Sequence, residues 1–317
     1  MTAMDEPTRS VFRDAEGPIP TRPAQGRSRR RREVSSRRRT RLTAKGVAFA
    51  TLKYGSLLFV AFAVFLPLTA TFMTAFKTHA EYFNGQPLDM PGNWLNFDNF
   101  ATAWTSGNMF MGFLNTAVVL ALSLTGTIII GTMAAYAIDR FKFRGKGMIV
   151  FLFLLAAIVP SVTSQVATFQ VIDFLGLFNT RLSAIALFVG TDIIAIYIFV
   201  QYMRTIPISL DEVALLDGAS HWFIYRKIAF PLMKPAIVTV MIIKGVAIYN
   251  EFYIPFLYMP SQDLKMVSTS LFKFNGTFGA RWEVIAAGVI ITMIPTLVIF
   301  LALQRYIYSG LTRGTTR

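Results

Sequence analysis

Cysteine is absent from the 317-residue sequence, and histidine occurs only twice. Without cysteine the chain has no disulfide framework, no thiolate metal site and no cysteine nucleophile. The two histidines, His79 and His221, are far apart in the chain and lack a metal-binding spacing. The phosphate-loop pattern G-x-x-x-x-G-K-[ST] and a nucleophilic triad motif are also absent. These absences predict a chain that is not an enzyme and binds no cofactor or metal of its own.

Charged residues are scarce as well. They make up 15% of the chain, whereas about 25% is usual for a soluble globular domain. Hydrophobic residues make up 54%, and the mean hydropathy is +0.51. This composition predicts a protein that crosses a membrane several times and is surrounded by membrane lipid.

Six apolar stretches are long enough to cross a bilayer, whose core of about 30 Å requires about 20 residues of helix. Only helices and closed barrels satisfy their backbone groups in lipid, and the alternating pattern of a barrel is absent. We therefore predict an all-α fold with six transmembrane helices. They are expected at residues 54–76, 112–138, 148–172, 182–203, 235–260 and 284–303.

The net charge of +14 is unevenly distributed. With a cytoplasmic N-terminus, 25 of the 31 Lys and Arg residues fall in cytoplasmic segments and 5 in segments on the other face. The positive-inside rule therefore predicts that both termini are cytoplasmic. Residues 1–53 hold 14 of these bases and form, by composition, a disordered cytoplasmic tail before a membrane domain at 54–317. Such a tail is more typical of membrane-surface binding than of nucleic-acid binding, so we expect no nucleic-acid partner.

One cytoplasmic loop, residues 204–234, has the pattern of two short helices. Ser209, followed three residues later by Glu212, predicts a capping box at the start of the first helix. Asp211 and Glu212 lie in the first turn, where the helix dipole favours acids. Gly218 fits the C-terminal end of this helix.

The second helix of the loop is predicted to begin after Ser220, which serves as its cap, and to stop at Pro231. The residues alone leave two interpretations open. The loop is either an amphipathic hairpin resting on the membrane surface or a docking element for a cytosolic protein.

The loop resembles a signature of the membrane subunits of bacterial ABC importers, which reads E-A-A, three residues, G, nine residues, I-x-L-P. The matching residues are Glu212, Ala214, Gly218, Ile228 and Pro231, and the departures are Val213 and Phe230. Both departures are conservative in size and polarity.

The resemblance covers most of the chain from about Tyr54. It includes FLNTAVVLALS (113–123), AAYAIDRFKFRGK (134–146) and YNEFYIPFLY (249–258). These stretches are similar to the carbohydrate-uptake branch of the family, and most of all to the second permease of the maltose-type importer. The resemblance implies a subunit that forms half of a sugar pathway in the bacterial cytoplasmic membrane.

The same resemblance implies the partners. They are a second permease subunit, two copies of a cytosolic ATPase that binds ATP and Mg, and an extracytoplasmic solute-binding protein. It identifies the loop as the pair of coupling helices that docks on the ATPase. The residues assigned to ATPase coupling are Asp211, Glu212, Ala214, Leu215, Asp217, Gly218, Ala219, Ile228 and Pro231.

Charges inside the predicted spans mark a second candidate site. Lys244 and Glu251 are seven residues apart, which predicts one face of a single helix and a separation of about 10 Å. YNEF (249–252) resembles the family's aromatic–Asn–acid–Phe motif near the translocation path. The residues assigned to the substrate pathway are Lys244, Tyr249, Asn250, Glu251 and Tyr253. A structural polar contact between spans is the alternative, and Asp192 receives no role.

The sequence leaves other functions open. A glycerol phosphodiester or phosphate ester is an alternative substrate, because related importers carry such compounds. An ion-coupled secondary carrier would show more spans or an inverted repeat, and a membrane-bound enzyme or sensor would need a catalytic constellation or an output domain. None of these features is apparent in the sequence.

Overall fold

The computed structural model describes residues 44–159, 163–190, 193–276 and 279–312. Asp192 and most of the predicted basic tail lie outside these residues. The chain divides into two compact units, Met1–Leu57 and Leu58–Arg317, and all contacts described below lie within the second. Helix α1 (Ala44–Phe76) begins before the predicted boundary at residue 54, so the end of the predicted tail is helical.

Three helices of the described residues are long and apolar enough to cross a membrane as single elements. They are α1, α4 (Met109–Arg140) and α15 (Trp282–Thr312). These helices confirm the first, second and sixth predicted stretches as helical. Helix α4 ends with a basic residue in its last turn, where the helix dipole favours a positive charge, and the backbone becomes extended at Phe141.

The other three predicted spans are not single straight helices. The third predicted span is divided into α5 (Lys146–Ile158) and α6 (Gln165–Phe174). The fourth is divided into α7 (Arg181–Gly190) and α8 (Ile193–Met203), which are bent by 43° relative to each other. The prediction of one continuous helix in each was wrong, because hydropathy averaged over a window records apolar length but not helix continuity.

The fifth predicted span is shorter than expected. Helix α12 (Lys234–Asn250) ends before Glu251, whose backbone is extended, and a separate short helix, α13 (Tyr253–Tyr258), follows. Lys244 and Glu251 therefore do not lie on one face of a single helix, and that prediction was wrong. Near its start, α12 is bent by 67° from the helical segment that precedes it.

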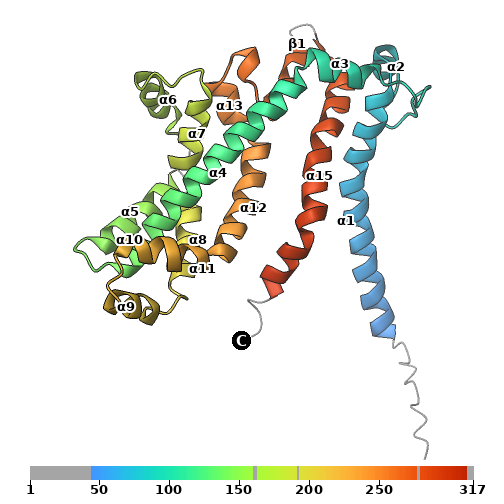
Figure 1. Cartoon of the computed structure of the whole chain (residues 1–317). Helices are drawn as coiled ribbons and strands as arrows, with labels where there is room; N and C mark the ends of the chain where they lie inside the picture. The colour runs from blue at the N-terminus through green and yellow to red at the C-terminus, as the bar shows by residue number, and fades with distance from the viewer. Residues whose placement is uncertain (1–43, 160–162, 191–192, 277–278, 313–317) are drawn as a thin grey trace, which may run out of the picture. The chain divides into compact units, whose positions relative to one another are not determined.

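Short elements lie at the two ends of the second unit (Figure 1). One end, called the hairpin end, carries α9 (Ser209–Leu216), α10 (His221–Ile224), the π-helical turn η1 (Tyr225–Ala229) and α11 (Phe230–Leu232). The opposite end carries α2 (His79–Asn84), α3 (Asp98–Ser106), η2 (Gln262–Leu264), α14 (Val267–Ser270), η3 (Leu271–Phe274), β1 (Asn275–Gly276) and β2 (Gly279–Ala280). The strands are antiparallel, with Asn275 opposite Ala280 and Gly276 opposite Gly279.

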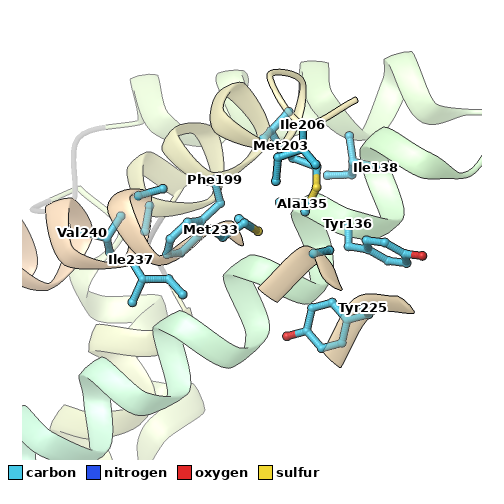
Figure 2. Close-up of a cluster of buried hydrophobic side chains, with 14 of the residues drawn as sticks. Ala135, Tyr136, Ile138, Phe199, Met203, Ile206, Tyr225, Met233, Ile237 and Val240 are labelled. Carbon is cyan, nitrogen blue, oxygen red and sulfur yellow. The ribbon is translucent and has the colours of Figure 1, made fainter. Parts of the chain in front are cut away.

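Helix α4 lies at the centre of the packing and contacts α7, α8, α12 and α14. It crosses the unit from the hairpin end to the opposite end (Figure 1). The absence of a side chain at Gly131 allows close approach to α8, because a Cβ atom there would lie 2.8 Å from Cδ2 of Phe199. This contact belongs to a buried apolar cluster that joins α4, α8, η1 and α12 (Figure 2).

Candidate functional site

The predicted loop is a hairpin of two short helical segments, α9 and α10–α11, joined at Gly218. Gly218 has a φ of +83°, a left-handed conformation that favours glycine. Its N–H donates to the carbonyl of Leu215 at 3.0 Å, and the N–H of Ala219 donates to the carbonyl of Ala214 at 2.9 Å. This pair of bonds is a Schellman motif. The predicted glycine at the end of the first helix is confirmed.

The predicted capping box at Ser209 was wrong. Ser209 is the first residue of α9, and the cap position is held by Ile208, without a side-chain hydrogen bond. Asp211 and Glu212 do lie in the first turn, as predicted. The cap predicted for the second helix is confirmed, since the Ser220 hydroxyl accepts from the N–H of Phe223 at 3.3 Å.

The second helical segment ends at Leu232, one residue beyond the predicted stop at Pro231. The chain continues from α10 through η1 into α11 and ends at Leu232. In η1 the N–H of Phe230 donates to the carbonyl of Tyr225, five residues earlier. The π-helical turn shifts the hydrogen-bond pattern just before proline, which has no N–H to donate, so the last turn of the segment accommodates Pro231.

A buried ion pair fastens the start of α9 to the end of α4. Nε of Arg140 lies 2.8 Å from Oδ2 of Asp211, and both side chains are buried. Arg140 also donates to the carbonyl of Ile206 at 2.9 Å and pairs with Asp139 at 2.5 Å. Asp211 is the only buried residue of α9. The sequence assigned Asp211 to ATPase coupling, and the structure gives its side chain an internal partner, Arg140, which sequence reasoning missed.

A second attachment lies in the apolar cluster of Figure 2. Tyr225 of η1 packs its ring against Tyr136 of α4, with centroids 5.6 Å apart. The Tyr225 hydroxyl lies 2.9 Å from Oγ1 of Thr132. Ala214, Ala219 and Ile228, which the sequence assigned to coupling, are partly buried and pack against this cluster. They hold the hairpin in place rather than forming its outer face.

The rest of the hairpin is exposed and combines acids with large apolar side chains. We call the following residues the hairpin surface: Glu212, Val213, Leu215, Leu216, Asp217, Trp222 and Phe223. Leu216 is 88% exposed, although it lies in a regular helix. Exposed large apolar side chains gathered on one short element are typical of an interaction site. The hairpin is thus fixed on one side and open to a partner on the other.

The second predicted site, around YNEF, has internal partners for its polar groups. The Tyr249 hydroxyl donates to the carbonyl of Thr292 in α15 at 2.8 Å. The Asn250 amide donates to the carbonyl of Val246, one turn earlier, at 2.9 Å. Asn250 and Tyr253 are exposed, whereas Tyr249 is partly buried. These contacts favour a bracing role for Tyr249 and leave Asn250 and Tyr253 accessible.

Glu251 lies at the break between α12 and α13. Its Oε1 atom accepts from the N–H groups of Tyr253 at 2.9 Å and Ile254 at 3.3 Å, so the carboxylate caps the start of α13. The hydroxyl of Ser268 donates to the Glu251 carbonyl at 2.6 Å. Lys244 is partly buried within α12, away from this break in the chain.

An aromatic cluster beside Glu251 was not predicted. Phe252 and Phe256 stack with centroids 5.2 Å apart, and Phe272 contacts Phe256 at 4.8 Å and Phe252 at 5.9 Å. All three rings are about two-fifths exposed. The spacing of four residues between Phe252 and Phe256 was a visible helical signal. Phe272 joins them through the tertiary fold, which the sequence pattern does not reveal.

At the opposite end Glu81 completes a capping box on α2. Its carboxylate accepts from the N–H of Thr78 at 2.7 Å and from the N–H of Gly92 at 3.1 Å. The backbone hydrogen bond from Thr78 is the main cause that lowers the pKa of Glu81 below its usual value of 4.5. The charged carboxylate therefore joins α2 to the loop that follows it.

Comparison with known proteins gives a consistent result. The family model described as "Binding-protein-dependent transport system inner membrane component" matches residues 127–313. A melibiose/raffinose/stachyose import permease of Bacillus subtilis is 30% identical over 81% of this chain and 93% of its own length. A diacetylchitobiose uptake system permease of Streptomyces coelicolor is 27% identical over 85% of this chain and 89% of its own length.

Two solved structures share the fold. One is a bacterial ABC transporter involved in the import of the acidic polysaccharide alginate, with a TM-score of 0.72 and 18% identity over 83% of this chain and 98% of that chain. The other is a bacterial alginate ABC transporter in complex with a pentasaccharide-bound periplasmic protein. It has a TM-score of 0.60 and 21% identity over 84% of this chain and 98% of that chain.

Proposed function

Because this chain belongs to the family of binding-protein-dependent transport system inner membrane components, we propose that it is the permease subunit of a sugar or oligosaccharide importer. It forms half of the translocation pathway and couples that pathway to a cytosolic ATPase. The hairpin is the observation that carries the coupling role. Its exposed surface fits a protein partner, while Arg140 and the apolar cluster fix it to the membrane helices.

The hairpin attachment supports mechanical coupling. A partner that moves the hairpin surface displaces α9, and the buried ion pair passes that displacement to α4. Breaking the pair would leave a charge buried without its partner, which is costly, so the two elements move together. The loop has polar character because its partner is a soluble protein. We assign Glu212, Leu215 and Asp217 to contact with the ATPase and Gly218 to the turn.

The proposed topology has six spans, with both termini cytoplasmic. In it α5–α6, α7–α8 and α12–α13 each cross the membrane as a broken helix. Breaks at membrane depth are tolerated where they are buried in protein or line a water-filled cavity, which suits a pathway-forming subunit. The distribution of Lys and Arg supports this orientation. It places the hairpin and the basic tail, residues 1–53, in the cytoplasm of a bacterium, and the opposite end outside its cell membrane.

The proposed assembly contains a second permease subunit, two ATPase copies and a solute-binding protein. The ATPase copies bind ATP and Mg, and this chain contributes no cofactor. The solved complex of the alginate transporter with its periplasmic protein supports a solute-binding protein as a partner. The outer loops 77–111 and 261–283 are the regions assigned to that contact.

The proposed substrate is a sugar, as the names of the relatives suggest. Those names include melibiose, raffinose, stachyose and diacetylchitobiose. Of the pathway residues, Asn250 and Tyr253 are exposed enough to meet a sugar, and Phe252, Phe256 and Phe272 add apolar faces next to them. Lys244, Tyr249 and Glu251 are assigned to shaping this region from within.

Purification of the chain from its native membrane in a mild detergent tests the proposal. We expect an ATP-binding subunit, a second permease and a solute-binding protein to co-purify, and the ligand of that binding protein identifies the sugar. Membrane vesicles carrying the complex should take up this sugar only when ATP is supplied. Recovery of the chain alone, with uptake that depends on an ion gradient and not on ATP, would contradict the proposal.

A further inference from the structure

Helix α4 is fastened by buried polar contacts at the opposite end as well as at the hairpin end. Asn115, near its start, is fully buried. The Asn115 amide donates to the carbonyls of Asp263 at 2.8 Å and Lys265 at 2.9 Å. Its Oδ1 atom accepts from Nε of Arg181 at 2.8 Å. The two bonds of the amide N–H groups therefore hold the segment around η2, and the Oδ1 atom joins α4 to the start of α7.

The next residue of α4 adds a second attachment. Oγ1 of Thr116 accepts from the N–H of Val267, the first residue of α14, at 2.9 Å. Gly112, one turn earlier, allows α14 to lie close, because a Cβ atom at Gly112 would lie 2.5 Å from Oγ of Ser270. We call residues 261–270, which these contacts hold, the outer segment.

Between these attachments α4 is one unbroken helix. Asn115 and Arg140 are 25 residues apart, which corresponds to about 37 Å along the axis at about 1.5 Å per residue. The other routes from the hairpin end to the opposite end are interrupted. Helix α12 ends at Asn250, and the pair α7–α8 is bent by 43°.

On the basis of the proposed function, we propose that α4 acts as a rigid coupling helix. It transmits the movement of the hairpin to the outer segment, and Asn115 is the positioning residue that attaches α4 to that segment. The argument rests on matched attachments, a buried ion pair at one end and a buried amide with two hydrogen bonds to the outer segment at the other. A shift of α4 along its axis must move both attached segments or leave buried polar groups without partners. Tightly packed elements of this kind move as units between discrete positions.

A purely structural role for Asn115 is the competing explanation, and Asn99 provides a matched control. Asn99 is also buried, and its amide also donates to two backbone carbonyls, those of Ala75 at 2.9 Å and Lys77 at 2.8 Å. It lies on α3, and these two bonds reach the end of α1 and the residue that follows it rather than α4 or the outer segment. Replacing either asparagine by leucine removes two amide-to-carbonyl hydrogen bonds, and at residue 115 it also removes the acceptor of Arg181.

The experiment measures movement at the outer segment directly. Because the chain has no cysteine, spin labels can be placed on Gln262→Cys and Asn93→Cys, which are both exposed. The distance between the labels is measured in the full complex, reconstituted in lipid with its ATPase, before and after trapping with ATP and vanadate. We expect the trapped state of the otherwise unchanged chain to shift this distance.

The proposal predicts that Asn115→Leu abolishes the distance shift while ATPase binding and basal ATP hydrolysis change less than about twofold. Asn99→Leu should keep the shift. Thr116→Val, an isosteric change, should reduce the shift if Asn115→Leu does not assemble. A distance shift that persists in Asn115→Leu and Thr116→Val, or that is lost equally in Asn99→Leu, overturns the proposal that α4 is a rigid coupling helix. Failure of any ATPase to bind the unchanged chain would instead overturn the proposed function.

Discussion

Arg140 and Asp211 form a buried ion pair, with Nε and Oδ2 2.8 Å apart, that joins the last residue of α4 to the first turn of α9. The two residues are 71 positions apart in the chain. Helix α9 has no other buried residue, and only Ala214 adds a partly buried apolar contact. The hairpin owes its position to an electrostatic contact at one end and to apolar packing of η1 at the other.

Removing one member of this ion pair should lower the free energy of unfolding. We expect Asp211→Ala to destabilise the folded chain by about 2 kcal/mol, because the buried Arg140 guanidinium loses one of its two carboxylates and keeps only Asp139. Thermal unfolding in detergent measures the loss. The triple variant Asp139→Asn with Arg140→Met and Asp211→Leu should recover most of it, since no charge of this cluster is then left without a partner. A triple variant no more stable than Asp211→Ala would contradict this account.

Substitution of Gly218 tests the importance of the left-handed turn between α9 and α10. Gly218→Ala should cost about 1–2 kcal/mol through its positive φ, and the hairpin should bind the ATPase more weakly. Space is not the cause, because a Cβ atom at Gly218 would meet nothing within 4 Å. Gly147 is a matched control, since a Cβ atom there also meets nothing and its φ is ordinary. Equal loss of co-purified ATPase in Gly147→Ala would refute the role of the turn.

A substitution on the hairpin surface tests whether the ATPase docks there. Leu216→Asp should reduce co-purification of the ATPase at least tenfold, because a buried interface charge without a partner typically costs more than about 1.4 kcal/mol. The stability of the isolated chain should not change, because the side chain is 88% exposed. Leu95→Asp, at a leucine 77% exposed at the opposite end, is the control and should retain the ATPase. ATPase recovery from Leu216→Asp equal to that of the control argues against docking on this surface.

Glu251 separates a structural role from a pathway role. Glu251→Ala should destabilise α13 by about 1 kcal/mol, because the N–H groups of Tyr253 and Ile254 lose their acceptor. Glu251→Gln keeps an acceptor oxygen and should retain the stability. Reduced uptake by Glu251→Gln in a fully assembled complex would show that the pathway itself uses the charge. Normal uptake by this variant would leave Glu251 with the capping role alone.

Glu81 predicts a pH dependence at the opposite end. Its pKa is lowered in the folded chain, so its charge stabilises the fold above the unfolded pKa, near 4.5, and this contribution is lost as the pH falls through the lower folded pKa. Wild type should therefore exceed Glu81→Gln in melting temperature at pH 7, and the difference should vanish in acid. We expect less than about 1 kcal/mol, because the group is near the surface. A difference that grows on acidification has the wrong sign for this mechanism.

The elements that could be predicted are those defined by short-range signals. The turn at Gly218, the cap at Ser220 and the acids at the start of α9 all follow from neighbouring residues. The capping box predicted at Ser209 was wrong because the start of α9 is set by Asp211 and its distant partner, Arg140. Local capping chemistry competes with tertiary contacts, and here an ion pair across 71 residues had the larger effect.

The breaks in the apolar stretches could not be predicted from hydropathy. In the sequence, Glu251 looks like a charge within one helix. In the structure its carboxylate caps α13, and the start of this second helix is the reason that α12 ends. Phe272 joins Phe252 and Phe256 through the fold, and Asn115 finds carbonyl partners almost 150 residues away. Sequence patterns identify which side chains need partners, but they do not say which partners the fold supplies.

The π-helical turn before Pro231 has a consequence for the chain's tolerance of insertions and deletions. A π-helical turn holds one residue more than an α-helical turn, and one residue corresponds to a rotation of about 100°. The extra residue thus sets the direction in which Trp222 and Phe223, before η1, point relative to α12, which follows it. A single-residue deletion within Tyr225–Ala229 would allow a regular α-helix, yet it would turn the outward-facing aromatic side chains towards a different direction. The length of this five-residue segment is therefore under a stricter constraint than the chemical identity of its exposed side chains.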